Sequence, residues 1–339
     1  MLLDFIILIV GAAMVLLGAD ALTGGASDLA RRWGISELII GLTVVALGTS
    51  MPEFVVSVIS SFENKPDLAI GNVIGSNLFN TLVILGITAL ICPVSVSKQV
   101  VGKDIPWSIL SSVLLLIMAS GTILDGEANN ELTRSDGLVL LLIFITFIYY
   151  TILVARKDEA SAGPQIKAEP AGDANINEAG NEAQTTENQY NPLWKSILFI
   201  LLGLVGLIWG GDLFVDSASD IAFSLGMSEG LIGLTIVAIG TSLPELATSV
   251  VAACKNKAGM AIGNAIGSNI FNVLLILGAS ATVTPLHLGN ITVVDLLMLV
   301  GVSFLVWLFA RTSYTLSRWE GGTMIGIYIC YMIYLILIQ

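Results

Sequence analysis

The sequence has little charge and almost no histidine. Only 12% of its 339 residues are charged and one is histidine, whereas 55% are hydrophobic. A soluble domain carries about 25% charged residues, so most of this chain is expected to lie in lipid. The net charge of -12 argues against a nucleic-acid partner, and nothing in the sequence calls for a required protein partner.

Cysteine is also scarce. The three cysteines, Cys92, Cys254 and Cys330, lie in or beside apolar runs and lack the spacing of a metal site. We therefore expect them to be packing residues. The apolar runs contain no serine–histidine, paired-aspartate or metalloprotease pattern, which argues against an intramembrane hydrolase. We predict no enzymatic activity and no cofactor.

Long apolar runs make up most of the remaining sequence. A membrane-spanning helix needs about 20 apolar residues. The first run is preceded by Asp4 rather than by a cation, so we interpret it as a retained span and not as a secretory signal. The sequence predicts an all-α polytopic membrane protein with ten transmembrane helices, near residues 2–20, 37–61, 68–92, 106–124, 137–155, 194–215, 229–253, 260–284, 291–310 and 322–338.

The positive charges are unevenly distributed between alternate loops. With the N-terminus outside, 12 of the 14 lysines and arginines fall in inner loops, and only Lys65 and Arg134 face outward. Because cytoplasmic loops collect these residues, we predict a multi-pass protein of the cell membrane with both termini extracellular. The acidic segment 156–192 would be a cytoplasmic linker whose composition favours disorder. It would separate two units, 1–155 and 193–339, and its shortness favours a prokaryotic membrane.

The two units repeat each other at a fixed offset of 192 residues. The segment "GLTVVALGTSMPE", residues 41–53, aligns with "GLTIVAIGTSLPE", residues 233–245, at ten of 13 identical positions. "GNVIGSNLFN", residues 71–80, aligns with "GNAIGSNIFN", residues 263–272, at eight of ten. Each half has five spans, an odd number, so the second copy enters the membrane from the opposite side. Inverted repeats of this kind are typical of secondary transporters.

Each copy of the first motif places a carboxylate deep within a span. Glu53 and Glu245 lie about fifteen residues into their spans, where an ionised group is costly and usually functional. No span interior contains a lysine or arginine to pair with them.

Pro52 and Pro244 precede the two glutamates and remove a helical hydrogen bond, which predicts that helices 2 and 7 are broken at the centre. Met51 and Leu243 are expected to leave helical geometry. The breaks would offer carbonyl groups and the hydroxyls of Thr49, Ser50, Thr241 and Ser242.

The second motif places a polar stripe on a helix. Asn72, Ser76 and Asn80 step by four residues and so share a face, as do Asn264, Ser268 and Asn272. Ser76, Asn80, Ser268 and Asn272 lie deeper and are the better candidate ligands, whereas Asn72 and Asn264 also fit interhelical hydrogen bonding. Asn77 and Asn269 point off the stripe and are expected to support the backbone. Glycines at 71, 75, 263 and 267 would admit a close helix.

The repeated positions offer carboxylate, carbonyl, hydroxyl and amide oxygens without a repeated histidine, cysteine or methionine. Oxygen ligands suit hard cations such as Na⁺, Ca²⁺, K⁺ and Mg²⁺. Two glutamates match one Ca²⁺ or two Na⁺ in charge. Mg²⁺ fits less well, because it retains water and requires a rigid octahedron.

The two motif pairs resemble the two α-repeats of the sodium/calcium exchanger family, within the cation/calcium antiporter superfamily. The resemblance is specific over residues 41–86 and 233–278. It implies a secondary antiporter that exchanges Na⁺ for Ca²⁺ by alternating access. It further implies that Glu53 and Glu245 bind Ca²⁺ through carboxylates and Thr49 and Thr241 through backbone carbonyls, that Asn80 lines the centre, and that Na⁺ sites involve Ala46, Ser50, Ser76, Ala238, Ser242 and Ser268. Some relatives carry aspartate where this chain has Asn272, which argues against K⁺ co-transport here.

Two other transport mechanisms stay open at this stage. One is exchange driven by protons, with the two glutamates titrating, although the "GNxxE" phrase expected of proton/calcium exchangers is missing. The other is a cation channel, which an internal inverted repeat does not favour. For alternating access, the glycine-rich first and sixth spans are the candidates for the moving helices.

Overall fold

The protein is almost entirely helical. The computed structural model describes residues 2–63, 65–124, 130–161, 192–225, 238–289 and 291–338. Within these ranges eight helices are long and apolar enough to cross a membrane, and a bent pair, Glu37–Thr49 with Met51–Phe62, is a ninth candidate. The predicted all-α polytopic class is confirmed. Residues 229–237 of the predicted span 229–253 lie outside the described part, as do residues 162–191 of the acidic linker.

The first half of the chain contains α1 (Leu2–Trp33), α2 (Glu37–Ile40), the π-helix η1 (Gly41–Val45), α3 (Ala46–Thr49), α4 (Met51–Phe62), α5 (Pro66–Phe79), η2 (Asn80–Ile84), α6 (Leu85–Ile91), β1 (Val94–Ser95), η3 (Val100–Asp104), α7 (Ile105–Met118), α8 (Gly121–Leu124), β2 (Glu131–Leu132) and α9 (Arg134–Ser161). The second half contains α10 (Leu193–Ser224), α12 (Ala238–Thr241), α13 (Leu243–Cys254), α14 (Ala258–Phe271), η5 (Asn272–Leu277), α15 (Gly278–Val283), β3 (Leu286–His287), α16 (Val293–Ser313), β4 (Thr315–Leu316) and α17 (Arg318–Ile338).

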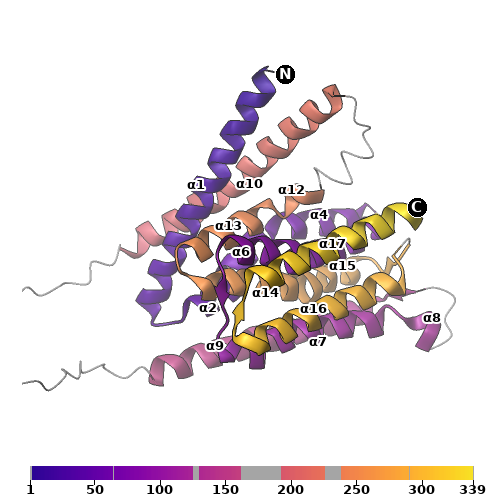
Figure 1. Ribbon diagram of the computed structural model, residues 1–339. Coiled ribbons are helices and arrows are strands. Elements are labelled where there is room, and N and C mark those ends of the chain that lie inside the picture. Colours follow the sequence, from indigo (N-terminus) through magenta and orange to yellow (C-terminus); the bar gives the residue numbers. More distant parts are fainter. Residues whose placement is uncertain are drawn as a thin grey trace, which may run out of the picture.

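Helices α1 and α10 form an antiparallel pair that projects from the rest of the molecule (Figure 1). Glycines allow their backbones to meet. A Cβ atom placed on Gly18 would lie 2.8 Å from the carbonyl oxygen of Gly203, and one on Gly203 would lie 2.6 Å from the backbone nitrogen of Leu22. Gly11, Gly18, Gly203 and Gly210 therefore serve close packing between these two helices, whereas a Cβ atom added to Gly211 would meet no described atom within 4 Å.

Some span boundaries predicted from hydropathy were wrong. The spans 2–20 and 194–215 end too early, because α1 continues to Trp33 and α10 to Ser224. The extension of α1 carries charged residues, yet Leu22, Ala26 and Leu29 keep one face buried, and that burial favours continued helix. The span placed at 106–124 instead runs through η3 and α7 and ends at Met118.

Two helical columns form the centre of the protein. In the column α14–η5–α15, 94% of the 18-residue stretch that is most apolar is buried inside the protein. In the column α5–η2–α6 the corresponding share is 78%. The corresponding share is 44% or less in the other long described spans. These two columns carry the repeated "GNxIGSNxFN" motif, so the polar stripe lies in the interior and not against lipid.

Two short strand pairs tie the halves together at opposite ends of α5–α6. Strand β1 pairs antiparallel with β4, and β2 pairs with β3. In the second pair, His287 Nδ1 lies 3.0 Å from Glu131 Oε2, so a side-chain contact adds to the pairing of the two strands. Each pair joins one strand from each half of the chain.

Candidate cation site

The two broken helices have the same backbone geometry. Ser50 (φ −83°, ψ 7°) separates α3 from α4, and Ser242 (φ −92°, ψ 7°) separates α12 from α13. The first pair bends by 49°. Pro52 and Pro244 fall in the first turn of α4 and α13, where the missing N–H breaks no helical bond. The predicted breaks in helices 2 and 7 are confirmed, with one correction: Met51 and Leu243 begin the next helix, and the preceding serine leaves helical geometry.

The two glutamates are buried and face each other's repeat. Glu53 is 1% exposed and Glu245 is 0% exposed, each on the first turn after its break. Ser50 Oγ donates to Glu245 Oε1 at 3.0 Å, and Ser242 Oγ donates to Glu53 Oε1 at 3.4 Å. Each serine therefore serves the glutamate of the other half. The two inverted breaks come together at one point, and the two carboxylates with them.

Asn72 and Asn264 hold the glutamate-bearing helices in place. Each asparagine Nδ2 donates to the backbone carbonyl of its own repeat's glutamate, Glu53 or Glu245, at 3.3 Å in both cases. Each also donates to the Oγ of a serine that lies on the same helix as that glutamate, at 3.0 Å in both cases. The interhelical role considered for these two asparagines is confirmed. Thr49 Oγ1 adds a bond to Asn264 Oδ1 at 3.1 Å, so this hydroxyl already has a partner within the protein.

A chain of amides connects the two central columns. Asn77 Nδ2 donates to the carbonyl of Asn269 at 3.2 Å, and Asn272 Nδ2 donates to Asn77 Oδ1 at 3.0 Å. Asn269 Nδ2 donates to Thr81 Oγ1 at 2.7 Å. The expected backbone support holds for Asn77, whereas Asn269 bonds a side chain. Thr81 was missed by sequence reasoning because the repeat has Val273 at the matching position.

Several buried polar atoms beside the carboxylates have no hydrogen-bond partner in the described part of the chain. An unpaired buried donor or acceptor costs about 1–3 kcal/mol, so such atoms are suited to contact a bound ion or another polar group. Six of them belong to residues predicted to bind ions, and five of the six are oxygens: Glu53 Oε2, Glu245 Oε2, Ser268 Oγ, Asn272 Oδ1, and both amide atoms of Asn80.

The remaining predicted site residues lie close to the breaks. Ser76 is buried on α5. Ala46 is fully buried, and its carbonyl accepts the N–H of Ser50 at 3.0 Å. Ala238 begins α12, with its side chain outside the described set. Thr241 lines a cavity of about 430 Å³ together with Pro52, Pro244 and two aspartates of α10, Asp212 and Asp216.

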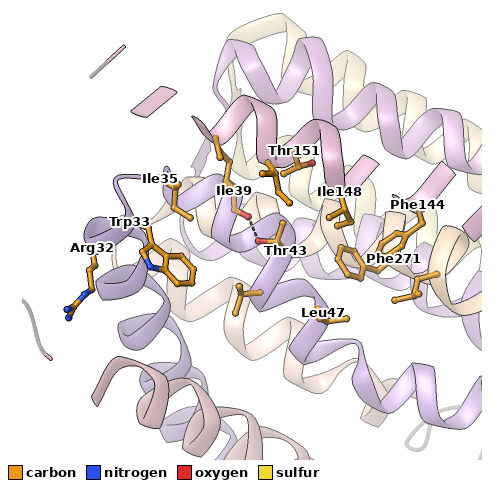
Figure 2. Close-up of a pocket in the computed structure, with 14 residues that line it drawn as sticks. Arg32, Trp33, Ile35, Ile39, Thr43, Leu47, Phe144, Ile148, Thr151 and Phe271 are labelled. Atoms are coloured by element: carbon orange, nitrogen blue, oxygen red, sulfur yellow. Dashed lines mark hydrogen bonds between the residues drawn. The ribbon is translucent and has the colours of Figure 1, made fainter. Parts of the chain in front are cut away.

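A second cavity, of about 930 Å³, lies between the end of α1, the α2–η1–α3 segment, α9 and η5 (Figure 2). Its walls are mostly apolar, with Ile39, Leu47, Phe144 and Phe271 among them, and Thr43 Oγ1 is already bonded to the Ile39 carbonyl at 2.7 Å. Neither glutamate lines it. This cavity has no carboxylate to hold a cation, so the candidate site is the cluster at the two breaks.

The cluster offers oxygen and little else. Among the described residues no group of three or more histidine, cysteine, aspartate or glutamate side chains could hold a metal. A cation at the breaks would therefore be held by two carboxylates with neutral carbonyl, hydroxyl and amide oxygens. This donor set suits Na⁺ and Ca²⁺ and does not suit the softer transition metals.

Comparison with known proteins agrees with this donor set. The profile of the family described as "Sodium/calcium exchanger protein" matches residues 3–153 and 195–337. The chain belongs to the sodium/calcium exchanger family. A family relative from Methanosarcina acetivorans, sodium/calcium exchanger MaX1, is 29% identical over 98% of both chains. The putative antiporter CaxA of Alkalimonas amylolytica is 37% identical over 84% of this chain and 82% of its own.

Solved structures of the family share the whole fold. A structure of the sodium-calcium exchanger NCX_Mj, soaked with zero Na⁺ and Ca²⁺, superposes with a TM-score of 0.79 at 31% sequence identity. The match covers 98% of this chain and 99% of the other. The similarity therefore extends across both halves, and the family assignment does not rest on the two short motifs alone.

Proposed function

We propose that this family member exchanges Na⁺ for Ca²⁺ by alternating access, with Glu53 and Glu245 as the Ca²⁺ carboxylates. One observation carries the proposal. The two carboxylates are buried, each accepts a bond from the other repeat's serine, and each keeps one oxygen with no partner among the described residues. Two such carboxylates are stable only if bound cations or protons neutralise them.

Competition for the same oxygens couples the two ions. Two negative charges are matched by one Ca²⁺ or by two Na⁺, so full binding of one ion excludes full binding of the other. If only the neutralised protein changes sides, the gradient of one ion drives transport of the other. Without a bound ion, the two carboxylate charges are buried and uncompensated. This net negative charge would oppose the conformational change that moves the site from one side of the membrane to the other.

The other ligands follow from the residues around the breaks. Thr49 and Thr241 would add backbone carbonyls to Ca²⁺. Asn80 and Asn272 would present amide oxygens toward the centre. The Na⁺ sites would be completed by oxygens of Ser50, Ser242, Ser76, Ser268, Ala46 and Ala238.

A neutral residue at position 272 favours exchange without K⁺. Asn272 is fully buried, and its Nδ2 is engaged by Asn77. Only one amide oxygen is therefore left for a cation, where an aspartate would supply a charge. We expect no dependence of Ca²⁺ transport on K⁺.

The contacts between loops support the proposed orientation. Lys255 forms an ion pair with Asp20, and Lys257 Nζ donates to the carbonyl of Thr23 at 3.3 Å. These cations therefore contact the C-terminal half of α1, the half that carries Arg31 and Arg32. We place this end in the cytoplasm of the cell, with both termini outside and the linker 156–192 inside.

The helix pair α1–α10 is the candidate moving element between the two units, 1–155 and 193–339. It lies to one side of the central columns (Figure 1), and the described glutamates and asparagines of the site all lie on other helices. A glycine-rich pair can slide as one body while the site residues keep their mutual contacts. Proton-driven exchange stays as the alternative, because the same two carboxylates could bind protons.

Uptake by sealed vesicles tests the proposed function. Vesicles containing the purified protein are loaded with Na⁺ or with K⁺, and radioactive Ca²⁺ is added outside. We expect rapid uptake only from the Na⁺-loaded vesicles, abolished when Na⁺ is equal on both sides. Uptake that follows a pH gradient without Na⁺ would establish the proton mechanism instead, and uptake without any counter-ion gradient would indicate a channel.

A further inference from the structure

Two cysteines from opposite halves of the chain touch each other. Cys92 caps the C-terminus of α6, and Cys254 is the last residue of α13. Their Sγ atoms lie 2.7 Å apart, although 162 residues separate them in the sequence. The expectation that the cysteines serve only packing does not explain this contact, since Cys254 is exposed and Cys92 is only partly buried.

The pair lies where an oxidant can reach it. Cys254 is followed by Lys255, whose ammonium group forms an ion pair with Asp20. Both side chains of this pair are exposed to a large extent, and an exposed charged pair is costly in hydrocarbon, so we place it at the membrane surface. The neighbouring Cys92 leaves helical geometry and leads into strand β1. Both thiols are therefore at a helix end beside water.

Helices α6 and α13 also border a shared apolar cavity. It has a volume of about 370 Å³ and is lined by Ile87 and Ile91 of α6, by Leu243, Leu246 and Val250 of α13, and by residues of α1 and α10. A covalent bond between the two thiols would fix the distance between the two helix ends.

We propose that Cys92 and Cys254 are a modification site, where a two-electron oxidant such as a peroxide forms a disulfide that joins the two repeats. One of the two thiols, as its thiolate, attacks the peroxide oxygen, so that an S–O bond forms, the O–O bond breaks and the released hydroxide takes up the thiol proton as water. The other thiol then attacks the sulfenic sulfur, the S–S bond forms and the second water leaves. Two thiols lose two electrons in total, and their protons end in the two waters.

The bond would join one helix that carries a candidate site residue to the end of a column that carries two others. Helix α13 carries Glu245, and α6 continues the column that carries Ser76 and Asn80. Neither α1 nor α10 is included in the link. This part of the inference rests on the proposed function: if α1 and α10 move against a fixed core, the disulfide leaves Na⁺/Ca²⁺ exchange intact.

The disulfide is tested by separating the halves of the full chain. A protease site is inserted within residues 162–191 of a Cys330→Ser protein, and the vesicles are treated with hydrogen peroxide and then cleaved. We expect the two fragments to migrate as one band without reductant and as two bands with dithiothreitol. Cys92→Ser and Cys254→Ser, each introduced separately into the Cys330→Ser protein, should give two bands both with and without dithiothreitol.

A matched control uses the remaining thiol. The Cys254→Ser protein that retains Cys330 on α17 still has two cysteines, and its fragments should separate without reductant. If oxidised Cys92/Cys254 fragments separate without reductant, or if the joined band persists in Cys254→Ser, the proposed disulfide is wrong.

Transport measured on the same vesicles tests the fixed core. We expect equal Na⁺-driven Ca²⁺ uptake before and after oxidation. A loss of uptake that dithiothreitol reverses, and that Cys254→Ser does not show, would overturn the fixed core while leaving the disulfide in place. If reduced and oxidised protein both fail to take up Ca²⁺ in a Na⁺ gradient, the proposed function fails, and the gel result stands independently.

Discussion

Ser50 in the first repeat donates its hydroxyl to Glu245 in the second at 3.0 Å, and Ser242 donates to Glu53 at 3.4 Å in return. Neither half of the protein therefore holds a complete site. Each glutamate depends on the helix break of the other half for a hydrogen-bond donor. The packing of the two repeats against each other brings both carboxylates and both serines to one point.

Removing either carboxylate charge should abolish Ca²⁺ exchange. Glu53→Gln and Glu245→Gln keep the side-chain size but leave one charge for a divalent ion, and the buried amide cannot replace the lost attraction. Na⁺-driven Ca²⁺ uptake measures the effect. The matched control is Glu63→Gln, which removes an exposed carboxylate paired with Lys65 at 2.7 Å and should transport normally. Near-normal uptake by both site variants would refute the assignment.

The crossed serines should set ion affinity and not folding. Ser50→Ala and Ser242→Ala each remove one hydrogen bond to a charged oxygen, worth about 1.5–3 kcal/mol. This corresponds to a roughly ten- to hundredfold weaker apparent affinity for Ca²⁺. We expect the larger effect for Ser50→Ala, whose bond is shorter. Thermal unfolding of the same variants serves as the control, and a large loss of stability with unchanged affinity would contradict the prediction.

Introducing a charge at position 272 should change ion preference while the fold is retained. In Asn272→Asp the donor to Asn77 Oδ1 is lost and two oxygens face each other, a contact that a bound cation would relieve. Uptake measured with Na⁺, K⁺ or both present should show an altered ion profile. Asn256→Asp, at an exposed turn after α13, adds the same charge outside the site. An unchanged profile in Asn272→Asp would show that this residue does not line the site.

The α1–α10 contact should tolerate no side chain at Gly18. A Cβ atom there would meet two backbone atoms at 2.8 Å, the Gly203 oxygen and the Leu207 nitrogen. Gly18→Ala should cost about 1–3 kcal/mol through overpacking, seen as a lower midpoint of thermal unfolding. At Gly24, on the same helix, an added Cβ atom would have no described atom within 4 Å. Gly24→Ala should therefore be neutral or slightly stabilising, and equal losses at both glycines would contradict this account.

The glycines of the second motif were predicted from the sequence to admit a neighbouring helix closely. Gly263 and Gly267 admit the α2–η1–α3 segment closely, since a Cβ atom added to them would lie 2.6 Å from the Leu38 oxygen and 2.8 Å from the Ala46 Cβ, respectively. A Cβ atom added to Gly71 or Gly75 would have no described atom within 4 Å. The matching partner segment, near residues 230–237, lies outside the described residues. The predicted close approach is thus confirmed for the second repeat, and for the first it stays a prediction.

The amino-acid sequence by itself determined the helical membrane architecture, the duplication and most of the candidate ligands. Polar residues in apolar spans are costly, so their recurrence at a constant offset of 192 residues singled out the glutamates, serines and asparagines. Proline placed the helix breaks to within one residue. These features are local, and they depend on side-chain chemistry at known positions along a helix.

Only the tertiary structure decided which groups meet. Four contacts join segments more than 150 residues apart in the sequence. They are Ser50 with Glu245, Asn77 with Asn272, Asn269 with Thr81, and Cys92 with Cys254. The tertiary structure also decided where helices end. Helices α1 and α10 continue beyond their apolar stretches because they pack on each other. Such contacts depend on how helices dock, and docking is set by the summed packing of many side chains that no single motif encodes.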